Sequence, residues 1–131
     1  MGAWGIGHFE NDDACDWAYD LEESRSLQPI IDALSGVEAS SDYLESPDAC
    51  IGLAAAEAIA ATRGKPSGDL PESVAAIVGE IASTVDASLV ARATAAVIRI
   101  RADSELKELW EETDDFAEWQ SRVDDLLQRL Q

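Results

Sequence analysis

The sequence has few of the side chains that enzymes use for nucleophilic or metal-assisted chemistry. It contains one histidine, His8, and two cysteines, Cys15 and Cys50, with no Cys-x-x-Cys spacing. It also lacks a glycine-rich phosphate loop and a Gly-x-Ser-x-Gly turn, which are typical of nucleotide-binding proteins and serine hydrolases. These absences argue against triad hydrolysis and a transition-metal centre, so we expect no catalytic residue, no cofactor and two buried free thiols.

Basic residues are also scarce. Nine Lys and Arg stand against 27 Asp and Glu, which gives a net charge of −18. A chain of this charge repels phosphate backbones and anionic membrane surfaces, so we expect binding to neither nucleic acid nor membrane. The start shows no charged region followed by an apolar run and a cleavage site, and no apolar stretch approaches the roughly 18 residues of a membrane span. We therefore expect a cytoplasmic protein.

The basic residues are concentrated in the middle of the chain. Residues 61–102 are close to neutral, whereas both ends are strongly acidic. We expect the basic side chains of the middle to pair with acids from both ends once the chain folds. These side chains are Arg63, Lys65, Arg92, Arg99 and Arg101.

Helical periodicity runs through most of the chain, and no segment shows the alternation of a strand. With 131 residues, the chain is long enough to form one domain with its own core. We therefore predict a single all-α domain over residues 1–131. It consists of a helical bundle of about six helices over residues 11–131 and a docked N-terminal Gly/Trp loop over residues 1–10.

Polar caps, prolines and glycines predict where these helices begin and end. Asn11 opens the first helix, and Gly36 is expected to end the second. The alanine-rich third helix carries only Glu57 as a charged residue between positions 49 and 62, so we place it at the centre of the bundle. The other expected signals are a Ser46 cap for the third helix, an Asp69–Glu72 capping box for the fourth, an Asp86 cap for the fifth, and a start at Ser104 for the last segment, with Thr113 and Asp114 as a break that would divide it in two.

The first 17 residues form the most unusual segment. Trp4 lies among three glycines, which permit positive φ and close backbone approach, so we expect Trp4 and Phe9 to dock onto the bundle. The pattern G-x-W-G-x-G-x-F-E-N-D-x-A-x-D-W, together with the segments 43–57 and 104–112, resembles a bacterial, actinobacterial-type family that is described only as a domain of unknown function. The resemblance covers almost the whole chain and implies no activity.

Polar side chains gather where this segment meets the first helix. Within nine residues lie His8, Glu10, Asn11, Asp12, Asp13 and Asp16. Clustered oxygens suit a hard cation, but the spacing matches no EF-hand loop. In the favoured alternative Asn11 caps the helix, the acids interact with its positive end, and His8 forms a local hydrogen bond. We therefore expect no bound metal.

Glu57 is a second candidate because it is a carboxylate on an otherwise apolar helix. Burial would raise its pKa and suit it to general acid or base catalysis. The favoured alternative is an ion pair that locks two helices together. The expected partners for such a pair are Arg92, Arg99 and Arg101.

Trp110 begins a third candidate, an aromatic residue followed by a dense run of acids. The acidic residues of this run are Glu111, Glu112, Asp114, Asp115 and Glu118. An exposed aromatic beside negative charge suits a basic protein partner, although such a run can also be a solvated helix face. The apolar row from Phe116 to Leu130 is expected to pack on its own bundle, with a dimer contact as the alternative.

These observations favour a non-enzymatic, acidic interaction module that binds a basic protein partner, of the immunity, antitoxin or regulator kind, as a monomer or homodimer. The alternative is a small-ligand or metal-binding protein, or a small enzyme, that uses the N-terminal loop with Glu57 beneath it. A third interpretation is purely structural, with Trp4 filling the end of the bundle.

Overall fold

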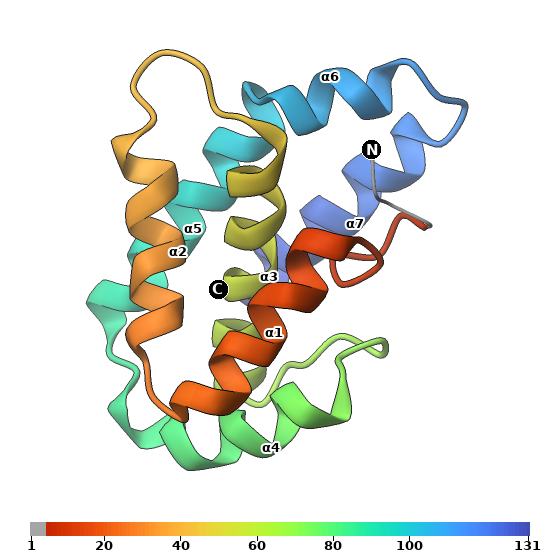
Figure 1. The fold of residues 1–131 in the computed structure, drawn as a ribbon. Coiled ribbons are helices and arrows are strands. Elements are labelled where there is room, and N and C mark those ends of the chain that lie inside the picture. Colours follow the sequence, from red (N-terminus) through yellow and green to blue (C-terminus); the bar gives the residue numbers. More distant parts are fainter. Residues whose placement is uncertain (1–4) are drawn as a thin grey trace.

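The computed structural model describes residues 5–131, which form seven α-helices and one short 3-10 helix and contain no strand (Figure 1). The all-α prediction is confirmed. The last segment divides at residues 112–115, where Thr113 and Asp114 indicated a break, and this division makes seven helices. The elements are α1 (Asp12–Ser24), α2 (Gln28–Ala39), α3 (Ser46–Thr62), α4 (Glu72–Ile81), η1 (Ala82–Thr84), α5 (Ala87–Ala102), α6 (Glu105–Glu111) and α7 (Phe116–Arg129).

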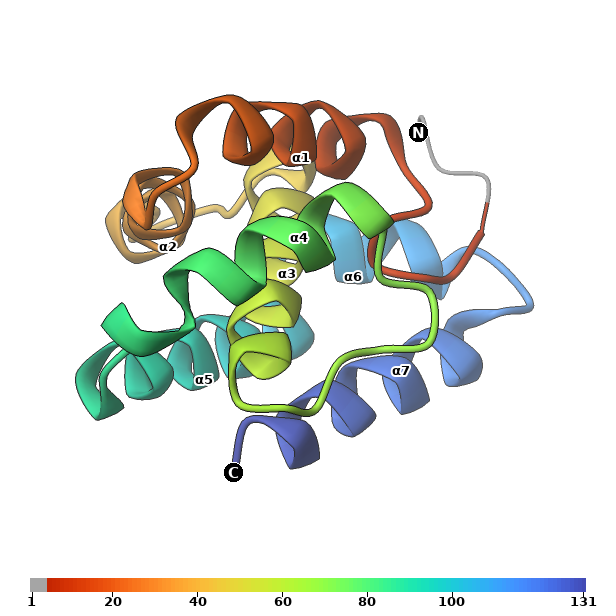
Figure 2. The same cartoon turned by 90° about the horizontal axis from the view of Figure 1, so that it is seen from below.

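Helix α3 lies at the centre, as predicted, and contacts all six other α-helices (Figures 1 and 2). It is buried nearly all round because its small alanine side chains let neighbouring helices approach closely. Gly52 marks the closest approach, since a Cβ at this position would lie 2.8 Å from Val37 and 3.0 Å from Ile100. The two neighbours belong to α2 and α5, so Gly52 sets how closely these helices pack on α3.

Two predicted caps are formed, and Ser104, the predicted start of the last segment, also acts as a cap. Asn11, Asp86 and Ser104 each accept a hydrogen bond from the backbone N–H three residues later, at 2.8, 2.8 and 3.1 Å. Each bond satisfies a backbone donor that has no partner within its helix. These caps fix where α1, α5 and α6 begin.

The predicted end of the second helix at Gly36 was wrong. Helix α2 continues to Ala39, and the next residue, Val37, is buried against the core. Glycine in a helix interior costs only about 0.5–1 kcal/mol relative to alanine. Burial of Val37 offsets that cost, so packing extends the helix past the glycine.

Two predicted caps were also wrong. Ser46 is the first residue of α3 and not its cap, and its backbone N–H donates to Glu105 Oε1 at 2.7 Å. Helix α4 begins at Glu72 after Pro71, and no side chain in the described part of the chain caps it. Asp69, the expected cap, instead hydrogen-bonds Ser67 in the preceding loop.

The N-terminal loop prediction falls partly outside the described residues, because Trp4 and the three residues before it are not among them. Of the described part, Phe9 is buried in the core and Ile6 packs against it. Both cysteines are free thiols; Cys50 is buried as expected, whereas Cys15 is only half-buried, which corrects the expectation of two buried thiols. Within residues 5–131, none of the helices has the length and apolar character needed to cross a membrane.

Candidate functional site

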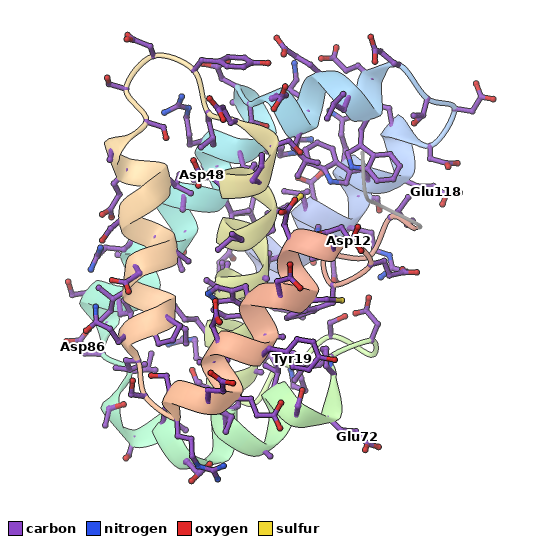
Figure 3. The ribbon with its side chains drawn as sticks, in the orientation of Figure 1. Asp12, Tyr19, Asp48, Glu72, Asp86 and Glu118 are labelled. Atoms are coloured by element: carbon purple, nitrogen blue, oxygen red, sulfur yellow. The ribbon has the colours of Figure 1, made fainter. Side chains whose placement is uncertain are left out.

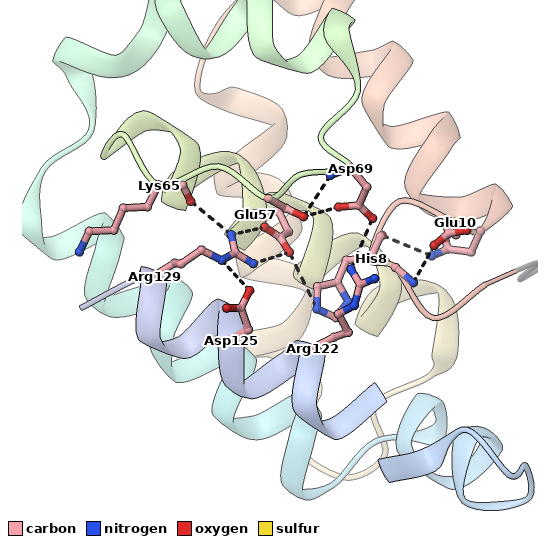
Figure 4. A network of polar contacts seen from close by, with 11 residues as sticks. His8, Glu10, Glu57, Lys65, Asp69, Arg122, Asp125 and Arg129 are labelled. Atoms are coloured by element: carbon pink, nitrogen blue, oxygen red, sulfur yellow. Dashed lines mark hydrogen bonds and ion pairs between the residues drawn. The ribbon is translucent and has the colours of Figure 1, made fainter. Parts of the chain in front are cut away.

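A buried ion pair joins α3 to α7. Glu57 accepts hydrogen bonds from both terminal nitrogens of Arg129, at 2.7 and 3.1 Å, and its side chain is 3% exposed (Figure 4). Arg129 also donates to Asp125 at 2.8 Å and to the Lys65 carbonyl at 3.3 Å. The hydrogen bonds to Glu57 raise the pKa of the Arg129 guanidinium, so it stays charged.

The sequence therefore identified Glu57 correctly as the member of an ion pair but named the wrong partners. The three arginines expected there, Arg92, Arg99 and Arg101, all lie on α5. Arg92 instead pairs with Glu38 at 2.9 Å, and Arg101 pairs with Asp124 at 2.7 Å. Those two pairs confirm that basic side chains from the middle of the chain reach acids near both ends. The other three basic residues of the middle segment, Arg63, Lys65 and Arg99, donate to backbone oxygens. Arg63 and Lys65 reach the oxygen of Gln131, and Arg99 reaches those of Ser40 and Asp103.

The imidazole of His8 lies on the other side of Glu57. Its Nε2 atom is 3.9 Å from Glu57 Oε2, and the residue is buried (Figure 4). Within residues 5–131 this nitrogen has no hydrogen-bond partner, so the expected local hydrogen bond is not formed there. Burial lowers the pKa of His8, while Glu57, a backbone hydrogen bond with Arg122, and Asp69 raise it and Arg129 lowers it further. The ring is therefore neutral at neutral pH.

The glycines before His8 make room for Glu10. A carboxylate oxygen of Glu10 accepts the backbone N–H of Gly7 at 3.1 Å. A Cβ at Gly5 or Gly7 would collide with that carboxylate, and one at Gly7 would also meet Asp69. The colliding atoms are the ends of flexible side chains, and Gly7 does not have positive φ, so the expected freedom of φ is not used at Gly7.

The acidic start of α1 is arranged as a helix terminus. Asn11 caps it, and Asp12 and Asp16 are exposed. Across residues 5–131 no three side chains of His, Cys, Asp or Glu come together in a way that could hold a metal ion. The favoured interpretation of this cluster, a capped and acid-stabilised helix start, is the one that the contacts support.

The space beside His8 is too small for a substrate. The cavity measures about 10 Å³, roughly the space of one water molecule. It is lined by Gly5, Ile6, Gly7, His8, Asn11, Cys50, Leu53, Leu106, Trp110 and Trp119. Among residues 5–131, the polar cluster of His8, Glu57 and Arg129 therefore joins the N-terminal segment to α3 and α7 without opening a ligand pocket.

Trp110 does not form the exposed aromatic anchor that the sequence suggested. It is 7% exposed, on a short helix whose apolar face turns toward the core beside His8. The acids that follow it, Glu111, Glu112 and Asp115, are exposed. These three residues, called here the α6–α7 acidic face, therefore offer negative charge without an aromatic residue, and the charge of Glu111 is partly offset by Lys107, whose Nζ atom lies 3.3 Å away.

A larger hollow, which sequence reasoning missed, lies among α1, α2 and the start of α3. We call it the α1–α3 groove. It measures about 300 Å³ and carries three carboxylates, one from each helix: Asp20, Asp32 and Asp48 (Figure 3 labels Asp48). The remaining lining residues are Trp17, Pro29, Ala33, Gly36 and Ile51. No local spacing reveals this site, because its acids are far apart in the sequence.

A protein-family model described as "Domain of unknown function (DUF4259)" matches residues 2–122 of the chain. The chain belongs to this family. The DUF4259 description assigns no activity. The match spans the α1–α3 groove together with His8 and Glu57, whereas Arg129 lies beyond its end at residue 122. Comparisons with curated proteins and with solved structures found no match.

The acids of this DUF4259 chain greatly outnumber their possible internal partners. Within residues 5–131, which contain every acidic and basic side chain, six of the nine basic side chains lie within 4 Å of a carboxylate. They engage seven of the 27 carboxylates, which leaves 20 without a basic side chain nearby. The longest of these contacts joins Arg122 to Asp69, at 4.0 Å. The molecule therefore presents a large uncompensated negative charge to solvent.

Proposed function

We propose that the protein is a non-enzymatic, acidic interaction module that binds a basic protein partner, of the kind found among immunity factors, antitoxins and regulators. The observation that carries this proposal is the surplus of 20 carboxylates that have no basic side chain nearby. Charges of this density attract a basic protein from a distance and orient it as it approaches.

The buried polar cluster supports this proposal by what it does inside the molecule. The carboxylate of Glu57 is neutralised by Arg129 and covered by His8, and the adjoining cavity holds about one water molecule. An enzyme that used the N-terminal segment with Glu57 would need space for a substrate next to these groups. We propose instead that residues 1–10 dock as a cover over this end of the bundle, with His8 and Phe9 as the buried contacts.

The cysteines are compatible with a cytoplasmic location. Cys15 and Cys50 are free, as expected in a reducing compartment. Burial raises the pKa of both thiols, and that of Cys50 reaches about 11, so neither has the low pKa of a reactive cysteine.

Capture of partners from a lysate of the source organism tests the proposed function. The purified protein serves as bait at low and at moderate salt, and quantitative mass spectrometry measures what is retained. We expect a stoichiometric basic protein at low salt and less of it at moderate salt, because salt screens surface charges.

A second bait makes the test specific to charge. Glu111→Gln, Glu112→Gln and Asp115→Asn together neutralise the α6–α7 acidic face at three exposed positions. This bait should retain less of the basic protein than the wild type does at low salt. If the retained protein is neutral or acidic, or if salt has no effect on its capture, the proposed function is wrong.

A further inference from the structure

We infer that the α1–α3 groove receives an arginine side chain of the basic partner. This inference rests on the proposed function and names the contact that fixes the partner once charge has attracted it. Three properties of the groove carry the argument: its shape, its charge, and the glycine in its wall.

The floor of the groove is apolar and held in place. Trp17 is buried, and its indole N–H donates to the Pro29 carbonyl at 3.1 Å, which fixes the ring between α1 and α2. Ala33 and Ile51 complete the apolar lining. A volume of about 300 Å³ is at the lower end of the range for ligand pockets, so the groove suits one long side chain better than an extended ligand.

The charge of the groove has one sign. Asp20, Asp32 and Asp48 lie around it, and no basic residue is among its lining residues. Asp32 accepts a hydrogen bond from Gln28 at 2.7 Å, a neutral donor that leaves its charge in place. Among the described residues, no basic side chain lies within 4 Å of Asp20 or Asp48.

Gly36 leaves the wall of the groove open. It lies inside α2, where glycine lowers helix stability relative to alanine. Packing does not require glycine here, since an added Cβ would meet only a carboxylate oxygen of Asp48, at an ordinary 3.9 Å. A longer side chain at this position would project into the space between α2 and the start of α3.

Arginine fits this combination better than lysine does. Its methylene stem can lie on the floor made by Trp17, Ala33 and Ile51 while the charged end stays near the carboxylates. The planar guanidinium has five donors in a fixed fork, which suits it to carboxylate acceptors. An ammonium group is a single, strongly hydrated charge and gains less from acids that are set apart.

Titration with N-acetyl-arginine methylamide, followed by two-dimensional NMR of the labelled protein, tests the inference. We expect saturable shifts of the Trp17 indole N–H and the Gly36 amide. The same titration with the neutral citrulline analogue should leave both signals in place. N-acetyl-lysine methylamide should shift them more weakly at equal concentration.

Two matched variants separate filling of the groove from a general change in helix stability. Gly36→Leu places a side chain in the groove, whereas Gly79→Leu makes the same change inside α4, where an added Cβ would meet nothing within 4 Å. Gly36→Leu should abolish the saturable shift, and Gly79→Leu should retain it. Circular dichroism confirms that each variant is folded; if Gly36→Leu is not, the variant Asp20→Asn/Asp48→Asn takes its place and should also lose the shift.

Equal binding by the two leucine variants, or shifts that avoid Trp17 and Gly36, would overturn the inference. The two proposals can fail separately. If the probe does not enter the groove but a salt-sensitive basic protein is still captured, only the arginine site is wrong. If capture yields no such protein, the proposed function fails whatever the probe does.

Discussion

Replacement of Arg129 by methionine should be among the most destabilising single changes in the chain. It removes two hydrogen bonds from Glu57, whose side chain is 3% exposed and cannot regain water. Loss of one partner of a buried ion pair costs about 3–5 kcal/mol, because the remaining charge is left uncompensated. The whole free energy of unfolding of a domain this size is about 5–15 kcal/mol, so the loss should be a large fraction of the total.

The assay is urea unfolding followed by tryptophan fluorescence, with Arg101→Met as the matched control. Arg101 makes the same kind of contact with Asp124, but the two side chains are 36% and 52% exposed, and an exposed pair contributes about 0–1 kcal/mol. The double variant Glu57→Leu/Arg129→Met removes both charges and should recover most of the stability lost in Arg129→Met. If Arg129→Met lowers the free energy of unfolding no more than Arg101→Met does, the Glu57–Arg129 ion pair does not stabilise the packing of α7 on α3 as described.

The remaining predictions concern His8, two glycines, Trp110 and Cys50. The pKa of His8 is lowered in the folded protein, so below a pH of about 6.5 the unfolded chain binds a proton that the folded state excludes. The free energy of unfolding should therefore fall with acidification, by at most about 1.4 kcal/mol per pH unit. Unfolding at several pH values should show this fall in the wild type and a smaller one in His8→Gln. Gly36→Ala should raise the free energy of unfolding by about 0.5–1 kcal/mol, whereas Gly52→Ala should lower it because the added Cβ has no room. The same denaturation assay compares the two variants, and an equal gain in both would contradict the packing described for α3. Trp110→Ala should lower the free energy of unfolding by about 3–5 kcal/mol, measured by thermal or urea unfolding, because the side chain is buried. The folded variant should keep its affinity for the partner, and a loss of affinity without a loss of stability would show that Trp110 is a binding residue. Burial raises the pKa of Cys50 to about 11, so iodoacetamide should alkylate this thiol slowly in the native protein and fast after unfolding. Mass spectrometry measures both rates, and fast alkylation of the native protein would contradict the burial of Cys50.

Local signals in the sequence were sufficient to predict most of the helices. Asn11, Asp86 and Ser104 each act on backbone groups within three residues, so their capping roles can be recognised without knowledge of the fold. Gly36 was misread because the free energy that carries α2 past it comes from packing of Val37 in the core. A weak local preference of this kind is routinely overridden by tertiary contacts.

Only part of the candidate site could be predicted from the sequence, because its remaining contacts are also set by tertiary packing. Burial of Glu57 followed from its apolar helix, but its partner Arg129 is 72 residues away and was chosen by how α7 packs on α3. The sequence run at Trp110 showed which acids are near an aromatic residue, but it did not show which side of α6 faces the core. The α1–α3 groove gave no signal at all, because Asp20, Asp32 and Asp48 come together only when three helices have packed.

The most direct test of the central claim is the association rate constant of the captured basic partner, measured across a range of ionic strength. The wild-type rate should fall steeply as salt increases, because the net negative charge of the protein speeds the encounter. Neutralising Glu111, Glu112 and Asp115 should lower this rate and its salt dependence with little change in dissociation. The equal charge change at Asp20, Asp32 and Asp48 should in addition speed dissociation, because it removes a direct contact. An association rate that does not change with salt in the wild type would contradict the account.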